Sequence, residues 1–415
     1  MTGVWSYAEA ERHLSSLELF GMRFGLDRMR RLMTALGSPQ RRFESIHVVG
    51  TNGKSSTVRM TAAILERHGL RSGAYVSPHL TSFAERVQVA GRDLDEPAFA
   101  AAVQRAARAA ELVERTLPAE DGVTQFELLT AAAYSELAAR EVDVAVVEAG
   151  LGGRYDATNV IPSRVQALTN VGLEHTRWLG PTVSDIAREK LAVVRDGATL
   201  VVGALEAEAL EQARAAAAQA GARLVQAPNG AIPDLAALGR FQRENFAVAR
   251  ASAEAFLGSL DEGRVREAAA TTTVPGRCEI VGADPLTVLD GAHNPSGMAA
   301  LVESLPELGG APVVAVVSIL EDKDAASMLA GLLPACDAAI FTSNPNPRAL
   351  SPATLQSLAR QVRFADPVEI VAEPRRALAL ARQRAGASGM VVATGSIYLV
   401  AELAGAQRTR HARAR

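Results

Sequence analysis

The chain has 415 residues, of which 48% are hydrophobic and 21% are charged, and its net charge is −3 at pH 7. This length exceeds one ordinary domain, so we expect two or three cores, and the composition is typical of a globular rather than a disordered protein. The small net charge gives no large basic field, which argues against nucleic acid as a partner.

Apolar β-branched runs alternate with alanine-rich helical patterns from about residue 46 onward. Strands separated by helices predict parallel sheets that are covered by helices on both faces. The predicted strands are 46–49, 142–148, 164–170, 198–203, 286–290, 312–318, 337–342, 368–372 and 389–394. The predicted helices are 54–68, 97–116, 125–140, 205–220, 243–257, 296–305, 351–362 and 375–385.

We therefore expect an α/β protein with two domains. The first, 1–273, is predicted to be a P-loop ATPase-like domain with a parallel-rich sheet, and the second, 274–415, a smaller Rossmann-like α/β domain. The boundary is placed where LDEGRVREAAATTTVPGR, residues 260–277, interrupts the apolar rhythm with charges, threonines and a proline.

A glycine-rich turn lies between the first predicted strand and the first predicted helix, in the stretch IHVVGTNGKSSTVRM, 46–60. Backbone N–H groups at a helix start can wrap an anion, glycines permit its close approach, and a lysine adds a point charge. The sequence therefore predicts a nucleotide-phosphate loop of Gly50, Thr51, Asn52, Gly53, Lys54, Ser55 and Ser56. The alternative is a simple turn with a solvent-exposed lysine, because the spacing is GxxGK rather than GxxxxGK[ST].

Eleven strings in fixed order extend this observation along nearly the whole chain: RFGLDRMRRLMTALGSP, HVVGTNGKSS, YVSPHLTSFAERV, VVEAGLGGRYDATN, GLEHTRWLG, IAREK, LGRFQRENFAVA, PGR, LDGAHNP, DKD and GSIYLV. On these strings the chain resembles the Mur ligase superfamily, and specifically its folylpolyglutamate synthase/dihydrofolate synthase branch. The resemblance implies an N-terminal ATP-binding domain of the central Mur ligase type and a C-terminal glutamate ligase domain.

Glu148 ends the strand of VVEAGLGG, at the sheet edge where open α/β sheets bind ligands, and its carboxylate suits Mg²⁺. The resemblance adds Ser77 and His175 to this Mg²⁺ site. It also implies that Lys190 is carbamylated and is a ligand for a second Mg²⁺. From the residues alone, Glu148 could instead cap the turn, His175 could be a core histidine, and Lys190 could be a surface lysine paired with acids.

Polar side chains follow Glu148 in the same string. Asp156, Thr158 and Asn159 surround the turn made by Gly150, Gly152 and Gly153, and we expect Asp156 at the substrate site. The alternative is turn chemistry, which Asp, Thr and Asn all favour.

The resemblance also assigns residues around the second domain. Asp290 and His293 of LDGAHNP are expected near the phosphates and the acyl intermediate, with His293 also at the substrate. Arg277 is expected on the nucleotide phosphates, although it could equally form a domain-linking ion pair, and Asn245 is expected near the adenine. Lys323, Asp324 and Ser396 are family-like without an assigned chemistry, and Ser396 is a candidate helix N-cap.

Two phenylalanines are candidates for contact with a flat heterocycle. Phe83 and Phe126 lie in segments that resemble the pterin-side segments of the family, and aromatic faces stack well on such rings. The alternative for both is core packing.

Several features exclude other classes of protein. The N-terminus lacks a signal-peptide pattern, no apolar run is long enough to span a membrane, and Cys278 and Cys336 cannot form a disulfide framework. There is no nucleophile elbow and no zinc-ligand spacing. We expect a cytoplasmic, monomeric enzyme.

Together these features predict ATP-dependent amide ligation, in which ATP and Mg²⁺ convert a pterin-linked carboxylate to an acyl phosphate that the amine of L-glutamate attacks. Lys54, Lys190, Asp290 and His293 are the expected catalytic residues. A relative recruited to a non-folate acid and amine stays open, because Ser55, Val274, Glu174 and the string EKLAVV depart from the family pattern. A nucleotide-binding protein without ligase chemistry is the third alternative.

Overall fold

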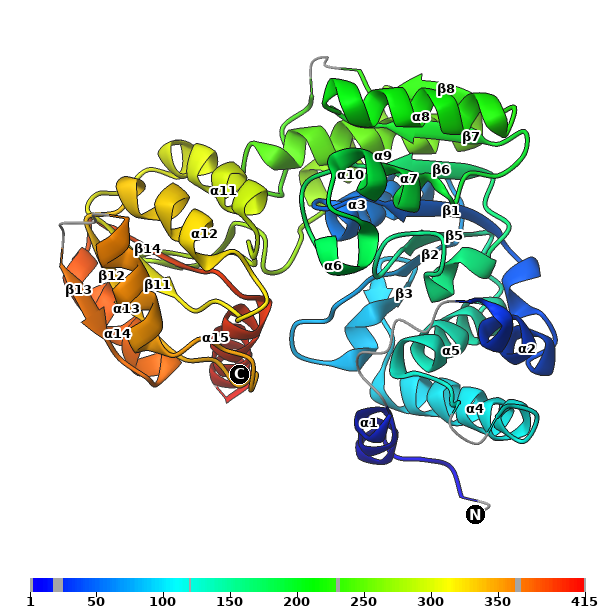
Figure 1. Ribbon diagram of the computed structural model, residues 1–415, viewed down its shortest axis with the longest axis horizontal. Helices are drawn as coiled ribbons and strands as arrows, with labels where there is room; N and C mark the ends of the chain where they lie inside the picture. Colours follow the sequence, from blue (N-terminus) through cyan, green and yellow to red (C-terminus); the bar gives the residue numbers. More distant parts are fainter. Residues whose placement is uncertain (1–2, 18–24, 119–120, 229–231, 363–366, 414–415) are drawn as a thin grey trace. The chain divides into compact units, whose positions relative to one another are not determined.

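The computed structural model describes residues 3–17, 25–118, 121–228, 232–362 and 367–413, and the side chains as far as residue 405 (Figure 1). The first two residues of the RFGLDRMRR string, 23 and 24, lie outside these ranges. The chain forms two compact units. The first contains Met1–Asp234 and Glu244–Thr272, and the second contains Leu235–Arg243 and Thr273–Arg415. The functions assigned to the two predicted domains stay predictions at this stage.

The first unit is built on an eight-stranded sheet with the order β4-β3-β2-β5-β1-β6-β7-β8. The six strands that run in this order from β2 to β8 are parallel, and β3 and β4 are added antiparallel at one edge. The strands are β1 (Glu44–Val49), β2 (Ser72–Tyr75), β3 (Val87–Val89), β4 (Arg92–Asp93), β5 (Val144–Glu148), β6 (Val165–Leu168), β7 (Thr199–Val202) and β8 (Arg223–Gln226).

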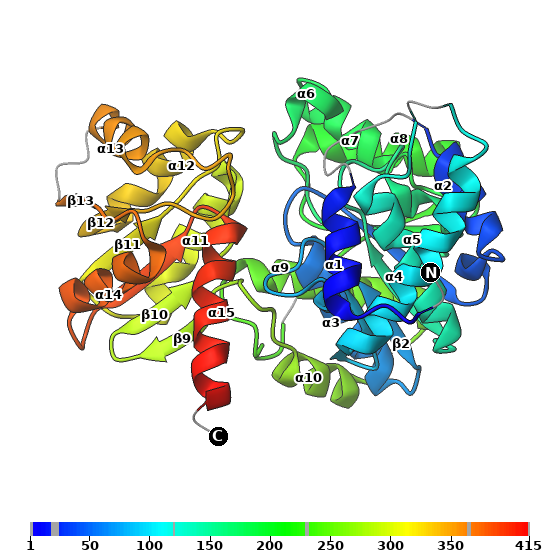
Figure 2. The same ribbon diagram turned by 90° about the horizontal axis from the view of Figure 1, so that it is seen from below.

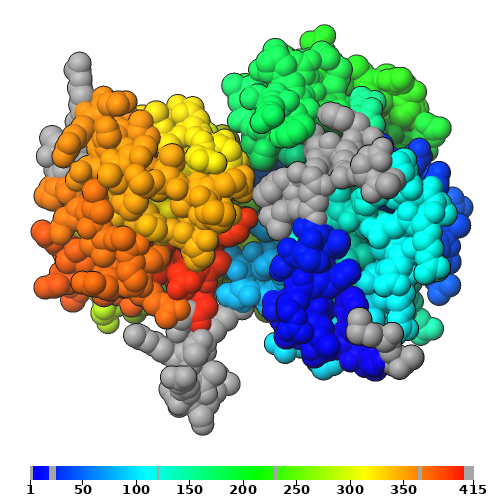
Figure 3. Space-filling model, turned by 60° about the horizontal axis from the view of Figure 1, so that its bottom comes forward, coloured from blue at the N-terminus to red at the C-terminus, as the bar shows by residue number. Residues whose placement is uncertain are grey.

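Helices pack against this sheet and against each other (Figures 1 and 2). They are α1 (Tyr7–Ser16), α2 (Asp27–Ala35), α3 (Lys54–Arg67), α4 (Glu96–Glu114), α5 (Gln125–Ala139), α6 (Thr176–Leu179), α7 (Val183–Leu191), α8 (Ala207–Gln219), α9 (Phe241–Leu257) and α10 (Glu262–Thr271). Short 3₁₀ turns are η1 (Pro39–Arg41), η2 (Phe83–Arg86) and η3 (Ala157–Val160). Helix α1 lies on the outside of the unit against α4 (Figure 3).

Two apolar clusters hold these layers together. One joins α1, α2, α4 and α5 to the sheet and contains the fully buried rings of Tyr75, Phe99 and Tyr134. The other joins α7 and α8 to β6 and β7 through residues such as Leu168 and Leu200. Because both faces of the central strands are covered, these strands are apolar throughout rather than alternating.

The register of the parallel strands sets the position of the site. Val48 of β1 is paired with Glu148 of β5, and Val147 of β5 is paired with Tyr75 of β2. The segments that follow β1, β2, β5 and β6 therefore leave the sheet at one edge, the carboxyl edge, where open α/β sheets bind ligands.

The second unit has a six-stranded sheet with the order β13-β12-β11-β14-β10-β9, parallel except for β9. Its strands are β9 (Glu279–Ala283), β10 (Leu286–Leu289), β11 (Val313–Val317), β12 (Ala338–Phe341), β13 (Val368–Ile370) and β14 (Met390–Thr394). Its helices are α11 (Pro295–Leu308), α12 (Ala325–Leu332), α13 (Pro352–Gln361), α14 (Pro374–Ala385) and α15 (Ile397–Arg413), with a 3₁₀ turn η4 (Leu333–Ala335).

A separate apolar cluster fills the second unit, with Leu301, Met328 and Phe341 among its fully buried residues. Leu238 and Phe241 pack against this cluster, which is why the short segment Leu235–Arg243 belongs to the second unit although it precedes most of α9. Cys278 and Cys336 are also part of it, and both are free thiols.

The predicted fold class is confirmed: the protein is α/β, with a large parallel-rich sheet and a smaller second sheet. Every predicted strand and helix has a counterpart within a few residues. The strands β2, β3, β4, β8 and β9 were not predicted, because each is short and has polar residues or glycine within it in place of an apolar run. No helix in the described ranges is long and apolar enough to cross a membrane.

The start of α5 offers a test of local stability. Thr124 caps this helix by accepting a hydrogen bond from Glu127 N, and the Glu127 side chain accepts one from Thr124 N at 2.9 Å. We expect Thr124→Ala to lower the free energy of unfolding by about 1 kcal/mol, because one N-terminal N–H loses its partner. Urea unfolding measures this, with Thr124→Ser as the matched control that keeps the cap. An Ala variant as stable as the Ser variant would contradict the capping role.

Candidate active site

The glycine-rich turn leaves the sheet after β1 and opens α3, as the sequence predicted. Gly53 stands at the N-cap position with φ +81°, and Lys54 is the first residue of the helix. Ser56 is buried in the first turn, and Ser55 is half-buried. The backbone N–H groups at this helix start, together with the helix dipole, form an environment that favours an anion.

The segment after β6 holds this loop in place, and the sequence analysis did not identify it. Thr51 N donates to Asn170 O at 3.0 Å, and Asn52 N donates to the Asn170 side chain at 2.9 Å. Thr169 Oγ1 donates to Asn52 O at 2.6 Å, and Gly172 N donates to Thr51 Oγ1 at 3.0 Å. The one signal in the sequence was the pair of polar residues directly after an apolar strand.

Two positions in the loop have no space for a side chain, because neighbouring residues lie too close to the backbone. At Gly50, a Cβ atom would come within 1.9 Å of Thr169 Oγ1, and at Gly53, within 2.0 Å of Asn245 Oδ1. Both residues also have positive φ, which a side chain disfavours. Asn245, which was predicted near the adenine, therefore lies directly against the phosphate loop.

Two lysines donate to the same backbone carbonyl. Lys54 Nζ lies 3.1 Å from Gly50 O and 3.0 Å from Thr51 O, and Lys190 Nζ lies 2.7 Å from Gly50 O. Lys190 is only 3% exposed, so the alternative of a surface lysine paired with acids is wrong for it. Burial, reinforced by the nearby charge of Lys54, lowers the pKa of Lys190 to about 7.

Lysine is rare in this chain, which makes the positions of these residues informative. The sequence has 43 lysines and arginines in total, and only Lys54, Lys190 and Lys323 are lysines. Lysine differs from arginine in that its pKa falls readily on burial, so that it can act as a neutral amine. All three lysines lie in strings that carry the family resemblance. A count of lysines in the sequence would therefore have pointed to these positions.

Glu148 and Ser77 are neighbours at the sheet edge. Glu148 is 2% exposed at the end of β5, and its Oε2 accepts a hydrogen bond from Ser77 N at 3.1 Å. Ser77 precedes Pro78 in a cis peptide bond. The carboxylate thus holds the segment that follows β2, and the contact brings together two of the predicted Mg²⁺ ligands, whose metal binding stays a prediction.

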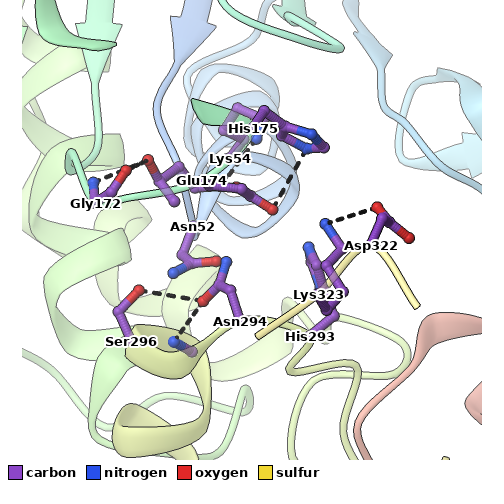
Figure 4. Close-up of polar contacts among 12 residues, drawn as sticks. Asn52, Lys54, Gly172, Glu174, His175, His293, Asn294, Ser296, Asp322 and Lys323 are labelled. Carbon is purple, nitrogen blue, oxygen red and sulfur yellow. Dashed lines mark hydrogen bonds and ion pairs between the residues drawn. The ribbon is translucent and has the colours of Figure 1, made fainter. Parts of the chain in front are cut away.

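His175 follows β6 in a left-handed conformation, at the start of α6. Its side chain is 34% exposed, which excludes a core histidine, and its Nε2 lies 3.5 Å from Glu174 Oε1 (Figure 4). No cluster of three or more His, Cys, Asp and Glu suited to a metal occurs among the described residues. That finding does not bear on the predicted ligand set, because only Glu148 and His175 in it are of these types.

Asp156 is used inside its own turn. Its carboxylate accepts from Leu151 N at 2.8 Å, from Thr158 N at 3.0 Å and, in a short contact, from Thr158 Oγ1. Burial raises its pKa, although these hydrogen bonds oppose the shift. The geometry therefore supports the alternative, turn chemistry, and the expected contact of Asp156 with substrate stays a prediction.

The two candidate aromatic residues are half-buried against the core of the first unit. The Phe126 ring stacks on that of Tyr75, with 6.3 Å between the ring centroids. It also lies against Gly150: a Cβ atom added to that glycine would be 2.6 Å from the Phe126 ring. The Phe83 ring lies 4.2 Å from that of His79, whose pKa burial lowers to about 4. Both residues pack against the core and are only half-buried, and a pterin contact stays a prediction.

The candidates in the second unit cluster at the end of β10. Asp290 is buried and accepts from Cys278 N and from Ala292 N, each at 2.8 Å. Burial raises the pKa of the Asp290 carboxyl, and the Arg277 guanidinium opposes this shift. Arg277 Nη1 donates to Gly276 O at 3.0 Å, and His293 Nδ1 lies 2.8 Å from Gly291 O.

Other family-like residues of the second unit have structural contacts. Asn294 caps α11 by accepting from Gly297 N at 2.7 Å, Asp324 caps α12, and Lys323 lies 3.8 Å from Asp322 (Figure 4). Ser396 Oγ accepts from Tyr398 N at 3.2 Å at the start of α15, which is the contact expected of an N-cap.

Comparison with known proteins defines the class of enzyme to which the chain is similar. A family model described as the glutamate ligase domain of Mur ligases matches residues 276–397. A FolC of Escherichia coli, solved in complex with DHPP and ADP, has a TM-score of 0.88 and 28% identity, covering 98% of this chain and 99% of that one. A folylpolyglutamate synthase/dihydrofolate synthase solved with Mn, AMPPNP and L-glutamate bound has a TM-score of 0.84 and 30% identity, covering 97% and 98%. This is the fold of ATP-dependent glutamate ligases.

The relatives found by sequence identify the family within this class of ligases. The dihydrofolate synthase/folylpolyglutamate synthase of Mycobacterium tuberculosis is 36% identical over 380 residues, covering 82% of this chain and 78% of that protein. The chain therefore belongs to the folylpolyglutamate synthase/dihydrofolate synthase family. The predicted family is confirmed, and so is the predicted class of enzyme, an ATP-dependent acid–amino-acid ligase.

The buried amine of Lys190 predicts how stability depends on pH. Its pKa is about 7 in the folded protein and 10.5 for a solvent-exposed lysine, so between these values the unfolded chain binds more protons. The free energy of unfolding should therefore rise with pH across this window, by at most about 1.4 kcal/mol per pH unit.

We expect Lys190→Met to reduce this slope between about pH 7 and pH 9, measured by urea unfolding at each pH. Arg188→Met is the matched control, because Arg188 is an exposed cation on the same helix. A slope that is the same in Lys190→Met and in the unaltered protein would show that Lys190 does not titrate in this range.

Proposed function

We propose that the protein joins L-glutamate to a pterin-linked carboxylate, that of dihydropteroate or of a reduced folate (poly)glutamate, and converts ATP to ADP and phosphate. The observation that carries this proposal is the meeting of Lys54 and Lys190 at the carbonyl of Gly50, at the start of α3. The names of the related structures support the same reading, since they report ADP, DHPP and L-glutamate bound to those proteins.

The phosphate loop would hold the triphosphate of ATP. The N–H groups at the start of α3 donate to phosphate oxygens, and Lys54 exchanges its contacts with Gly50 O and Thr51 O for the outer phosphate. A cation at this position offsets the charge that develops as the phosphoryl group moves to the acid.

The residues beside the loop fit a hard divalent cation in part. The carboxylate of Glu148 and the hydroxyl of Ser77 offer oxygen atoms, which Mg²⁺ prefers, while the contribution of His175 rests on the resemblance alone. Bound Mg²⁺ would neutralise phosphate charge and orient the transferring group. Lys190 does not fit as a ligand in its unmodified form, because its amine donates a hydrogen bond to Gly50 O.

Carbamylation would turn Lys190 into a ligand. A neutral amine adds to CO₂ and loses a proton to give a carbamate, whose two oxygens resemble a carboxylate. The lowered pKa of Lys190, about 7, keeps a large share of the amine neutral near neutral pH, which this reaction needs. The carbamate of Lys190 thus remains part of the proposal.

The family resemblance assigns the remaining charges to residues of the second unit. Arg277 carries a planar fork that suits phosphate oxygens, and Asp290 and His293 are proposed near the phosphates and the acyl intermediate. The acid substrate becomes an acyl phosphate, the amine of glutamate attacks its carbonyl carbon, and phosphate leaves as the amide forms. Phe83 and Phe126 are the proposed contacts of the pterin ring.

A screen of ADP release tests the proposal. With ATP, Mg²⁺ and L-glutamate, the purified protein should release ADP when dihydropteroate or tetrahydrofolate is added, and should remain at background without an acid. Lys54→Ala should lower this rate by at least about a hundredfold, since a cation on the transferring phosphate is lost.

Two results would contradict it. Turnover with a non-pterin acid, and none with either pterin, would assign the chain to a ligase recruited to another substrate. ADP release that is independent of any acid would indicate a nucleotide hydrolase without ligase chemistry.

The contact between Gly53 and Asn245 gives a second test, of the nucleotide loop alone. Gly53→Ala should weaken ADP binding by at least about tenfold, because the added methyl group meets Asn245 Oδ1 and displaces the loop. Gly69→Ala is the matched control: Gly69 follows the other end of α3, has φ +92° and has no neighbour within 4 Å of an added Cβ.

Both glycine variants should lose about 1–2 kcal/mol of stability through backbone strain, and Gly53→Ala should lose more because its methyl group also meets Asn245. Only Gly53→Ala should bind ADP more weakly in isothermal titration calorimetry. Equal affinity of the two variants would remove the loop from the nucleotide site.

A further inference from the structure

A pocket in the first unit lies far from the phosphate loop. Its volume is about 900 Å³, and it is lined by the segments that enter the sheet, before β1, β6 and β7, and by α2. The phosphate loop follows the last residue of β1, whereas Gln40 and Arg41 of this pocket precede its first residue. Six residues of strand separate the two ends, roughly 17–20 Å. The pocket is therefore distinct from the candidate active site.

The charge of the pocket lining is one-sided. Arg30, Arg41, Arg164 and Arg195 all line it, and Asp196 is the one acid among the lining residues. Arginine is common in this chain, but acids outnumber basic residues overall, 46 to 43, so the excess of four arginines over one acid in the lining differs from the overall charge balance. Guanidinium groups bind carboxylate and phosphate oxygens in pairs.

The most buried of these arginines is held by neutral partners. Arg195 donates to the carbonyl and side-chain oxygens of Asn159, each at 2.6 Å. These contacts fix the position of the guanidinium group without cancelling its charge.

The other arginines of the lining are at most weakly paired. Arg30 lies 3.4 Å from Asp27, and both side chains are largely exposed. The contact of Arg164 with Glu44 is longer, at 3.8 Å, and also joins exposed groups, and the guanidinium of Arg164 lies 5.0 Å from the ring centroid of Phe256, a contact that leaves its charge uncompensated. Arg41 has no ion pair in the described part of the chain. Ion pairs of this exposed kind contribute little, so the charges remain available to a ligand.

The pocket also has neutral and apolar groups. Gln40 is buried in the lining, and its amide oxygen has no hydrogen-bond partner in the described structure. Met33, Ile161 and Val165 add buried apolar surface to the lining. A volume of about 900 Å³ exceeds what a single inorganic ion needs and suits a small organic molecule.

From these observations we infer that the pocket between α2 and the amino ends of β1, β6 and β7 is a binding site for a small molecule with two or more phosphate or carboxylate groups. The inference rests on the pocket alone and is independent of the proposed ligase reaction. Phosphates and carboxylates both offer negatively charged oxygen atoms to the arginines, and the test distinguishes between the two groups.

The test is isothermal titration calorimetry of the full chain at low ionic strength, with pyrophosphate as the phosphate probe and citrate as the carboxylate probe. We expect at least one probe to bind, and Arg41→Ala/Arg164→Ala to raise its Kd by at least about tenfold, because two charge-assisted contacts are lost. Binding of only one probe identifies the preferred group, and binding of both supports the shared chemistry.

Arg108→Ala/Arg214→Ala is the matched control, because it removes two exposed arginines from α4 and α8 of the same unit without touching the pocket. Lys54→Ala separates the pocket from the phosphate loop and should leave the pocket-dependent binding in place. The inference is overturned if neither probe binds, if the control pair weakens binding as much as the pocket pair does, or if Lys54→Ala abolishes binding. Thermal unfolding of each variant verifies that it is folded.

Discussion

The carbonyl oxygen of Gly50 accepts hydrogen bonds from two lysines, and the rest of the candidate site is arranged around this contact. One amine comes from the first residue of α3 and the other from the end of α7, so the contact ties two distant segments to the end of β1. Two like charges at one acceptor are unfavourable unless one proton is lost or an anion is bound. The site is therefore built either to share a proton or to receive negative charge.

The parallel register of the sheet makes this arrangement possible. Because β1 lies between β5 and β6, the phosphate loop emerges beside Glu148 on one side and beside Thr169 and Asn170 on the other. Thr169 leaves no space for a side chain at Gly50, and a second neighbour, from α9, leaves none at Gly53. The loop is thus fixed from several directions before any ligand is present, which reduces the entropy lost on binding.

Sequence patterns were sufficient for the parts of the site whose structure is local. The strand, turn and helix around residues 46–67 can be read from apolar periodicity and glycine spacing, and so can the position of Glu148 at the end of a strand. The burial of Lys190 could not be read in the same way, because its helix carries charged neighbours and the carbonyl it meets lies 140 residues earlier in the chain. Thr169 and Asn170 were missed for the same reason, and the edge strands β3 and β4 were missed because they are too short to show a pattern.

The scarcity of lysine has a practical consequence. Two of the three lysine side chains, Lys54 and Lys190, belong to the first unit, and Lys323 belongs to the second. Because Lys190 is 3% exposed, an amine-reactive reagent added to the folded protein should label Lys54 and Lys323 and leave Lys190 unreacted. The same scarcity makes each modified lysine assignable by mass spectrometry without ambiguity, so occupancy of the phosphate loop could be followed through the labelling of Lys54 alone.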